Sequence, residues 1–351
     1  MKRDILFRLD KNVSKIGDIR KPRTNDVFKR LLVLPPEKIV LKNLLFKPLF
    51  AAFNPAMKID GNIVKIYARI IIGYFTYSSA VAELTMKLDD IYGSGPKENV
   101  EAEVVILPEN EVDFWGVEDP RVTLLNGVEF ITYTGRTKGF FEEDVNKTVP
   151  VVAKKTNGGW SKILYLKLPQ PLNQIVSLNK DAFIHMFGEE DKIHVFHRPV
   201  FENSPPSLWY GRIPSCSLER SGFNEEIIRD NRILMVPAEY EYNIGWGAPL
   251  IEIDGKYFAI AHARGVDEVY RLYLLQLEVD DDGFTVSGVS ETYVMEPMEV
   301  YEKYGDRPNV VFACGAEVVK DKVIISYGAA DNFVAFAEAD ISSLISLVKT
   351  I

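Results

Sequence analysis

Short runs of β-branched and aromatic residues, separated by turn-forming pairs, constrain the fold of this chain more than any other feature. The runs begin near residue 62 and include IVKIYARIII, VEFITYTGR, VPVVAKK, KIHVFHRPV, KYFAIAHARG, VYRLYLLQLEV, NVVFACGAEVV and KVIISYGAAD. The pairs between runs are Asp60-Gly61, Asn126-Gly127, Asn157-Gly158, Asp254-Gly255 and Asp282-Gly283. Asn-Gly and Asp-Gly suit the backbone of tight hairpin turns, so the pattern predicts consecutive antiparallel strands.

Helical patterns are confined to residues 35–50, residues 219–230 and the C-terminal ISSLISLVK, so strands do not alternate with helices. This argues against doubly wound and α/β-barrel folds. A chain of about eighteen to twenty short strands must protect its sheet edges, and radial repetition of four-stranded blades does so. We therefore predict an all-β fold, a five-bladed β-propeller with a short N-terminal helical arm. A pair of β-sandwiches is the alternative.

Charge is unevenly distributed along the chain. Residues 1–60 hold 14 basic and 6 acidic side chains, whereas the whole chain has a net charge of −9. We expect residues 1–50 to form a basic arm with short helices and residues 51–351 to form the propeller domain. The bases of the arm alternate with acidic and apolar residues and lack interleaved aromatic side chains, which argues against a nucleic-acid partner. We expect the arm to dock on the acidic body or on a second copy in a homo-oligomer.

Charged residues between positions 42 and 60 interrupt the most apolar N-terminal region, so no stretch reaches the roughly 18 residues of a membrane span. The first thirty residues leave no apolar core for a secretory signal. We expect no membrane partner and a cytoplasmic location. Cys216 and Cys314 lie far apart among apolar or small residues, which favours buried thiols over a disulfide or a metal site.

Alternate residues of a strand point to opposite faces, and this places polar side chains at two strand ends. In KYFAIAHARG, His262 and Arg264 follow an apolar stretch on one face, and in KIHVFHRP, Arg198 shares a face with Phe196. In a propeller, the ends of the innermost strands line the central channel. These side chains are therefore candidates for ligand contacts.

The segment GVEDPRVT carries the clearest candidate site. Asp119 precedes a proline, which biases it toward an extended backbone, and Glu118 and Arg121 flank it. The residues alone also allow a turn with a surface salt bridge. Because the segment lies between a Phe-Trp pair and a predicted strand pair, Asp119 is a candidate general acid.

Four motifs, taken in order, resemble glycoside hydrolase family 130: FNPAMKIDGNIVKIYAR, GVEDPRVT followed by ITYT, FHRP, and VVFACGAEVVKDKVIISYGAADNFVAFAEAD. The match spans about residues 45–340. The resemblance implies a five-bladed propeller enzyme, in a family made up mostly of inverting phosphorylases of β-mannosides, with some hydrolases. The implied substrates are a β-mannosyl disaccharide or oligosaccharide and inorganic phosphate, which give α-mannose 1-phosphate without a cofactor or metal.

The same resemblance makes Asp119 the proton donor, acting through a hydroxyl of the mannose ring. It places the mannosyl unit among substrate-binding residues, namely Asn54, Arg69, Glu118, Arg121 and Asp331. Structural alternatives exist for these residues. Asn54-Pro55 and Asp331-Asn332 are common turn sequences, and Arg69 could be a strand residue whose charge reaches solvent.

A phosphorylase also needs a cationic pocket for phosphate. By resemblance, Lys180 of LNKDAF, Arg198 of FHRP and His262 occupy positions of phosphate ligands. Asn243 of YNIGWGAP stands where the family has Lys, and Asp181 stands where the family commonly has Asn. Both changes go in the direction of the family's hydrolases, which lose phosphate ligands and gain an acidic residue that can activate water.

Phosphorolysis is the predicted activity, with hydrolysis and a noncatalytic carbohydrate-binding propeller as alternatives. Arabinan-degrading enzymes of similar fold use three spaced carboxylates, and no Asp in an early strand has the context of their general base. Linkage and acceptor sugar depend on loops outside the motifs. The aromatic residues Trp115, Trp209, Tyr210 and Trp246 are either platforms for the second sugar or packing residues.

Overall fold

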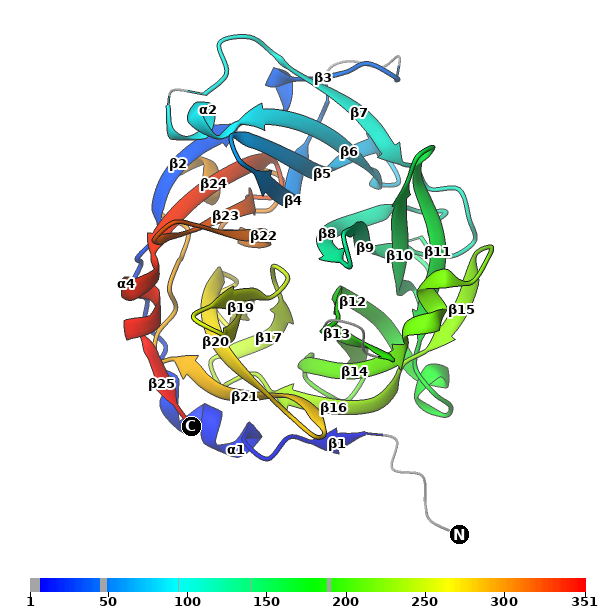
Figure 1. Ribbon diagram of the computed structural model, residues 1–351, viewed down its shortest axis with the longest axis vertical. Helices are drawn as coiled ribbons and strands as arrows, with labels where there is room; N and C mark the ends of the chain where they lie inside the picture. Colours follow the sequence, from blue (N-terminus) through cyan, green and yellow to red (C-terminus); the bar gives the residue numbers. More distant parts are fainter. Residues whose placement is uncertain (1–6, 45–48, 94, 140, 188–190) are drawn as a thin grey trace.

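Strands dominate the chain and stand radially around a common centre (Figure 1). This computed structural model describes residues 7–44, 49–93, 95–139, 141–187 and 191–351. Within these residues the strands form four sheets. The fold is all-β, as predicted, and the sheets surround the centre instead of stacking as two sandwiches.

The first sheet has five strands in the order β3-β7-β6-β5-β4. Its strands are β3 (Ile39–Leu41), β4 (Ala52–Asp60), β5 (Ile63–Gly73), β6 (Ser78–Lys87) and β7 (Val100–Ile106). The outer β3 pairs parallel with β7, and the other pairs are antiparallel. The predicted Asp60-Gly61 turn joins β4 to β5, with Gly61 at a φ of +57°.

The largest sheet has ten strands and consists of two antiparallel meanders. The first meander is β8 (Val117–Leu125), β9 (Val128–Arg136), β10 (Thr148–Thr156) and β11 (Gly159–Lys167). The second is β12 (Val176–His185), β13 (Lys192–Phe201), β14 (Leu208–Pro214) and β16 (Arg229–Met235). One parallel residue pair, Thr148 with Leu178, joins the meanders. Two short strands pair at the outside: β1 (Arg8–Leu9) with β16 and β15 (Asn224–Ile227) with β11.

The remaining two sheets complete the ring. One contains β17 (Glu241–Trp246), β18 (Ile251–Ile253), β19 (Lys256–Gly265), β20 (Tyr270–Asp280), β21 (Gly283–Ser290) and β25 (Val348–Thr350). The other is β2 (Lys29–Leu34), β24 (Phe333–Asp340), β23 (Lys322–Ala329) and β22 (Val311–Val319). Each strand run quoted from the sequence lies in one of these strands, with ends that differ by one or two residues.

Helices are few and short. They are α1 (Val13–Ile19), α2 (Leu88–Tyr92), α3 (Val300–Lys303) and α4 (Ile341–Ser346), with single 3₁₀ turns at Pro36–Lys38, Leu172–Gln174 and Ser215–Glu219. The C-terminal helix is confirmed by α4. The helix predicted over residues 219–230 is wrong, because that segment forms the edge strand β15.

The N-terminal segment contains one short helix, α1, and one 3₁₀ turn, but it is otherwise mostly extended, with the strands β1, β2 and β3. Within residues 35–50 the described part holds one 3₁₀ turn and β3, and residues 45–48 lie outside the described residues. Backbone pairing with sheet edges satisfies more hydrogen-bonding groups than an isolated short helix would. The segment runs along the outside of the ring to β2 (Figure 1).

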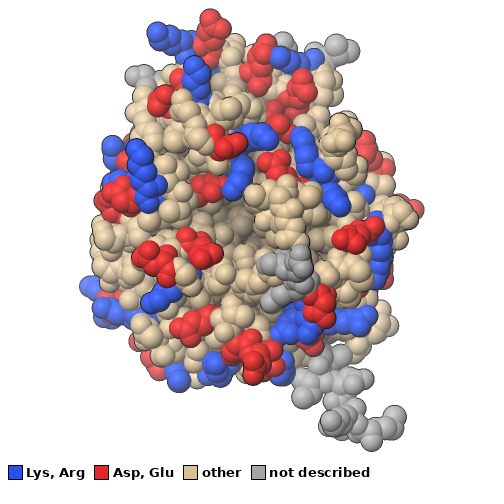
Figure 2. Space-filling view, viewed as in Figure 1, with Lys and Arg blue, Asp and Glu red and all other residues tan. Residues whose placement is uncertain are grey.

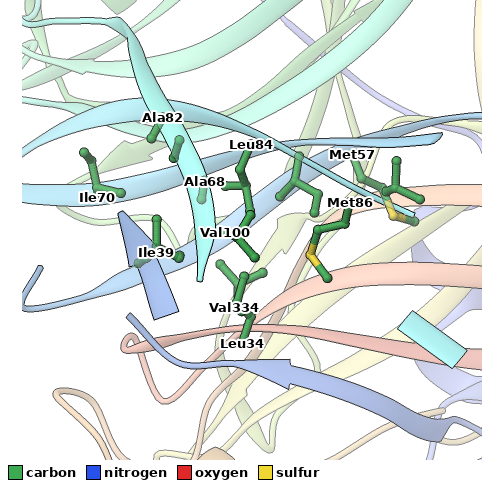
Figure 3. Packing of buried hydrophobic residues seen from close by; sticks show 14 of the residues in the cluster. Leu34, Ile39, Met57, Ala68, Ile70, Ala82, Leu84, Met86, Val100 and Val334 are labelled. Atoms are coloured by element: carbon green, nitrogen blue, oxygen red, sulfur yellow. The ribbon is translucent and has the colours of Figure 1, made fainter. Parts of the chain in front are cut away.

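Figure 3 shows how β2 joins the core. Leu34 of β2 and Val334 of β24 are paired on neighbouring strands of one sheet. They lie beside Ile39 and Val100 of the five-stranded sheet. Leu34 is 1% exposed. An N-terminal strand, β2, therefore pairs with a C-terminal one, β24, in a single sheet.

The cysteine prediction holds for one residue of two. Both cysteines are free; Cys314 is buried, but Cys216 is exposed in the 3₁₀ turn after β14. No described helix is both long enough and apolar enough to cross a membrane.

Candidate active site

The predicted proton donor, Asp119, lies on the inner strand β8 and is 6% exposed. Its Oδ1 accepts hydrogen bonds from Asn54 Nδ2 at 2.8 Å and from Arg69 Nη1 at 3.0 Å. Among the described residues, no hydrogen bond to its Oδ2 is found. One oxygen is therefore fixed by two donors while the other is available to a ligand.

A backbone irregularity explains how Asp119 leaves the strand face. The β8–β9 register shifts between Glu118 and Arg121, and Asp119 adopts a φ of +50°. Asp and Asn tolerate this left-handed conformation better than other non-glycine residues, and a bulge of this kind redirects a side chain.

The same device recurs on two other inner strands. Asn54 has a φ of +47° inside a register shift of β4, and Asp181 has a φ of +54° inside a register shift of β12. The sequences FNPA, EDPR and KDAF therefore share one backbone irregularity, with an Asn or Asp in the left-handed conformation at an inner-strand register shift. Figure 2 shows a hollow in the middle of this face with charged side chains of both signs around it.

Arg69 holds this group together from strand β5. Its Nε donates to Ser79 Oγ at 3.2 Å, and its Nη2 donates to Glu118 Oε1 at 2.9 Å, in addition to the bond to Asp119. The guanidinium also lies 5.0 Å from the centre of the Phe53 ring. Since each of its nitrogens already has a partner, Arg69 positions Asp119 more than it contacts a sugar.

Glu118 is a buried anchor for three cations. Its carboxylate pairs with Arg69 at 2.9 Å, Arg136 at 2.5 Å and Lys180 at 3.8 Å. Burial raises the pKa of Glu118, but the charges of these three residues outweigh it and lower the pKa to about 2. With 1% exposure, this side chain fixes cations around the site and offers little surface to a sugar.

Arg121 is fully buried, with 0% exposure, and joins β8 to β17. It donates to the carbonyl oxygens of Asp119 at 2.7 Å, Trp246 at 3.0 Å and Gly247 at 2.9 Å. The expectation that Arg121 contacts substrate therefore does not fit its environment. Its contacts brace the strand that carries Asp119.

Asp331 follows β23 in the turn to β24, with a φ of +50°, and its side chain is half-buried. Burial raises the pKa of Asp331 to about 6, with Asp119 and Asp306 adding to the rise and Arg69 and Arg307 opposing it. These charged neighbours place Asp331 beside the Asp119 group. Unlike Glu118 and Asp181, it has a raised pKa, and it forms no ion pair with a described residue.

The four residues expected to bind phosphate lie on β12, β13, β17 and β19. Lys180 stands opposite Arg198, and Asn243 stands opposite Arg264 in the neighbouring sheet. Asp181 lies among them: its Oδ2 accepts from Arg198 Nε at 2.5 Å and is 3.4 Å from His262 Nε2. An internal carboxylate thus already partners two of the expected ligands.

The protonation states of Asp181 and His262 follow from their burial and from their charged neighbours. Burial raises the pKa of Asp181, but Arg198, His262 and Arg121 lower it well below its usual range. Burial lowers the pKa of His262, and Asp181 only partly opposes this. His262 is therefore neutral at pH 7, and its single N–H is placed to donate to Asp181.

The aromatic candidates separate by burial. Trp246 and Tyr210 are 0% exposed and Trp209 is 3% exposed, so all three are packing residues. Trp115 is partly exposed, two residues before the β8 strand, and its ring lies 5.6 Å edge-on from that of Phe114. Only Trp115 of the four keeps surface for a sugar.

Sequence reasoning missed several neighbours of the site. Arg136, at the end of β9, binds Glu118, and Ser79 binds Arg69. Tyr270 and Arg307 adjoin His262 and Asp331 from β20 and the segment before β22. The repeated Asn/Asp at inner-strand bulges was a detectable signal, whereas Arg307 lies outside any motif.

Comparisons with known proteins agree with this arrangement. A family model described as beta-1,4-mannooligosaccharide phosphorylase, of glycoside hydrolase family 130, matches residues 18–350. Two relatives come from Thermoanaerobacter sp. (strain X514). A 1,2-beta-oligomannan phosphorylase is 28% identical over 66% of this chain and 71% of its own, and a beta-1,2-mannobiose phosphorylase is 27% identical over 82% and 89%.

A solved structure shares the fold. It is the beta-1,2-mannobiose phosphorylase from Listeria innocua in complex with beta-1,2-mannobiose, with a TM-score of 0.66 and 18% identity. The alignment covers 86% of this chain and 92% of that protein.

Proposed function

Because the chain belongs to glycoside hydrolase family 130, we propose that it is an inverting phosphorylase of β-mannosides. The observation that carries the proposal is Asp119, with Oδ1 held by Asn54 and Arg69 and with Oδ2 available. A fixed carboxyl group facing a central hollow is what a general acid requires. The reaction needs no cofactor, and inorganic phosphate is the second substrate.

The proposal includes a five-bladed propeller, with the two meanders of the ten-stranded sheet counted as separate blades. Its support is the recurrence of one irregularity. In each of the pairs β4–β5, β8–β9, β12–β13, β17–β19 and β22–β23 the register shifts on the inner strand. Five equivalent inner strands are the number that five blades supply.

In this mechanism Asp119 supplies the proton for the departing sugar oxygen, relayed by a hydroxyl of the mannose ring. The bond from mannose C1 to that oxygen breaks while phosphate attacks C1 from the opposite face. The products are α-mannose 1-phosphate and the shortened sugar. Asp331, which has no ion-pair partner among the described residues, accepts hydrogen bonds from hydroxyls of the same mannose.

Phosphate would bind beside Lys180 and Arg198. The Nη groups of Arg198 remain for phosphate after Nε binds Asp181, whereas the single N–H of neutral His262 faces Asp181. Charge-assisted bonds of this kind are the usual means of holding phosphate. Carbohydrate is the only partner that the proposal requires.

Hydrolysis is the second candidate, and Asp181 is the observation that favours it. Its carboxylate occupies Arg198 and His262, as a bound anion would. In a hydrolase the same carboxylate would activate water. Its full burial and ion pairing make it a poorly accessible base, so phosphorolysis remains the first choice.

Product analysis decides between the two reactions. β-1,2-Mannobiose, the substrate named for the relatives, and β-1,4-mannobiose are each incubated with the protein, with and without inorganic phosphate. Phosphorolysis gives α-mannose 1-phosphate only when phosphate is present. Free mannose released at equal rates in both cases would establish hydrolysis.

Asp119→Asn is the matched control for either reaction, since it preserves shape but removes the acid. Turnover should fall about 10²–10⁴-fold, the range that general acid catalysis supplies. Wild-type turnover of an unactivated disaccharide by this variant would refute the role of Asp119.

A further inference from the structure

An exposed arginine, Arg307, lies at the rim of the central site and has no ion-pair partner among the described residues. Arg307 precedes β22, and its backbone N–H donates to the carbonyl of Ala330 at 3.0 Å, next to Asp331. Its guanidinium carbon lies 4.7 Å from the centre of the Tyr270 ring. Within the described part of the chain, no carboxylate lies within ion-pairing distance of it.

Tyr270 links this arginine to the predicted phosphate site. The Tyr270 ring is 6.0 Å from that of His262, whose Nε2 faces Asp181. The Tyr270 residue is 8% exposed and pairs with Arg264 across the β19–β20 ladder. Arg307 therefore lies at the edge of the site, between the turn that holds Asp331 and the side chains of Tyr270 and His262.

The inner cations of the site share a few carboxylates. Arg198 is paired with Asp181, and Lys180 lies 3.8 Å from Glu118, which binds Arg69 and Arg136 at shorter distances. His262 is neutral and Asn243 adds no charge, so Lys180 is the least compensated cation among the expected phosphate ligands. A phosphate dianion beside Lys180 would be held more tightly if a further cation approached from the rim.

We propose that Arg307 is that cation and binds the phosphate group, either of inorganic phosphate or of α-mannose 1-phosphate. The inference rests on the proposed phosphorolysis and adds a ligand from outside the inner strands. The cation–π contact with Tyr270 holds the guanidinium group in place, and no hydrogen bond from its Nη atoms to a described residue is found. Arginine suits this task because its planar fork matches two phosphate oxygens.

Arg307→Gln tests the proposal, with Lys303→Gln as a matched control that removes a positive charge from the same segment. Loss of one charge-assisted bond should raise the KM for phosphate, and for α-mannose 1-phosphate in the reverse reaction, by about ten- to a hundredfold. The KM for mannobiose should change less than about threefold, and the control should match wild type. Melting temperatures verify that both variants fold.

A rescue variant sharpens the test. If Arg307 contributes charge, Asn243→Lys in the Arg307→Gln background should recover most of the lost phosphate affinity. A wild-type phosphate KM in Arg307→Gln, with phosphorolysis intact, would overturn the role of Arg307 and leave the proposed function standing.

Titration calorimetry with inorganic phosphate separates the two ideas when phosphorolysis is absent. Suppose that wild type binds phosphate and that Arg307→Gln binds it at least tenfold more weakly. The role of Arg307 in anion binding is then supported, although the proposal of phosphorolysis is refuted. If wild type shows no phosphate binding and only hydrolysis, both proposals are refuted.

Discussion

Asp331 is a site residue whose ionised form and backbone conformation are both unfavourable in the folded state. Its left-handed backbone is uncommon outside glycine, and its raised pKa means that burial disfavours the charged form. Asp119 and Asp306 increase this penalty, and Arg69 and Arg307 only reduce it. A carboxylate that costs stability is expected where a ligand needs a strong acceptor.

The pH dependence of stability tests this reading. The pKa of Asp331 is about 6 in the folded chain and 3.8 without the fold, so the folded state holds its proton more tightly. The associated stability is present below about pH 4 and is lost as pH rises through 6. Asp331→Asn lacks this loss and should be more stable than wild type at pH 7.5, by at most about 3 kcal/mol.

Urea unfolding of both proteins at pH 4.5 and pH 7.5 provides the measurement. The advantage of the variant should be larger at pH 7.5, while its KM for mannobiose rises about ten- to a hundredfold through the lost hydrogen bonds. An equal difference at both pH values would show that Asp331 does not titrate in this range.

At the scale of elements, the inner strands approach one another so closely that one of them needs glycine. A Cβ atom on Gly245 of β17 would lie 2.3 Å from Asp181 Oδ2 and 2.4 Å from His262 Nε2. The backbone of β17 therefore forms a wall of the Asp181 group. This contact joins β12, β17 and β19, which belong to two different sheets.

Gly245→Ala should disrupt this wall. The added methyl group must displace Asp181 or His262, so we expect at least a tenfold loss in kcat/KM for phosphate and a destabilisation of about 1–3 kcal/mol. Gly158→Ala is the control, because its nearest neighbour would be 3.9 Å away in an exposed turn. Wild-type kinetics in Gly245→Ala would show that the Asp181 group does not act in the reaction.

At the scale of the whole molecule, the N-terminal segment contacts all four sheets. Strands β1, β2 and β3 extend three of them, and the fully buried pair of Arg20 and Glu241 attaches the segment to the fourth. Tyr293 also donates to Glu241 at 2.6 Å. The segment therefore runs like a belt across the four sheets and links them. That the arm ends and the second domain begins at residue 50 stays a prediction.

Truncation distinguishes a belt from an independent arm. A chain lacking residues 1–34 loses β2 with its buried Leu34 and, just before it, buried Phe28, and each of these side chains is worth about 2–5 kcal/mol. This loss approaches the 5–15 kcal/mol typical of a domain, so the truncated chain should be unfolded or aggregated. Among the described residues, a chain lacking residues 1–9 loses the exposed β1 and the ring contact of Phe7 with Trp209, and it should unfold within about 1 kcal/mol of wild type. Tryptophan fluorescence in urea compares the three chains, and equal midpoints would favour the independent arm.

Local patterns in the amino-acid sequence were enough to predict the all-β class, the hairpin turns and the order of the inner motifs, because strand alternation and turn chemistry depend on neighbouring residues. Asn126-Gly127 and Asp254-Gly255 adopt the positive φ values that their residue types favour. The same local signals overestimated helix near residues 35–50 and 219–230, where pairing with a distant sheet edge prevailed over local propensity.

Only the tertiary structure decided which charges of the site are free. Asp181 and His262 are separated by 81 positions, and Arg20 and Glu241 by 221. Neutralisation depends on distances of a few ångströms between such segments, which no local pattern encodes. For the same reason the sequence could nominate Arg121 and Trp246 as ligand contacts, whereas their complete burial followed only from the packing of one sheet against the next.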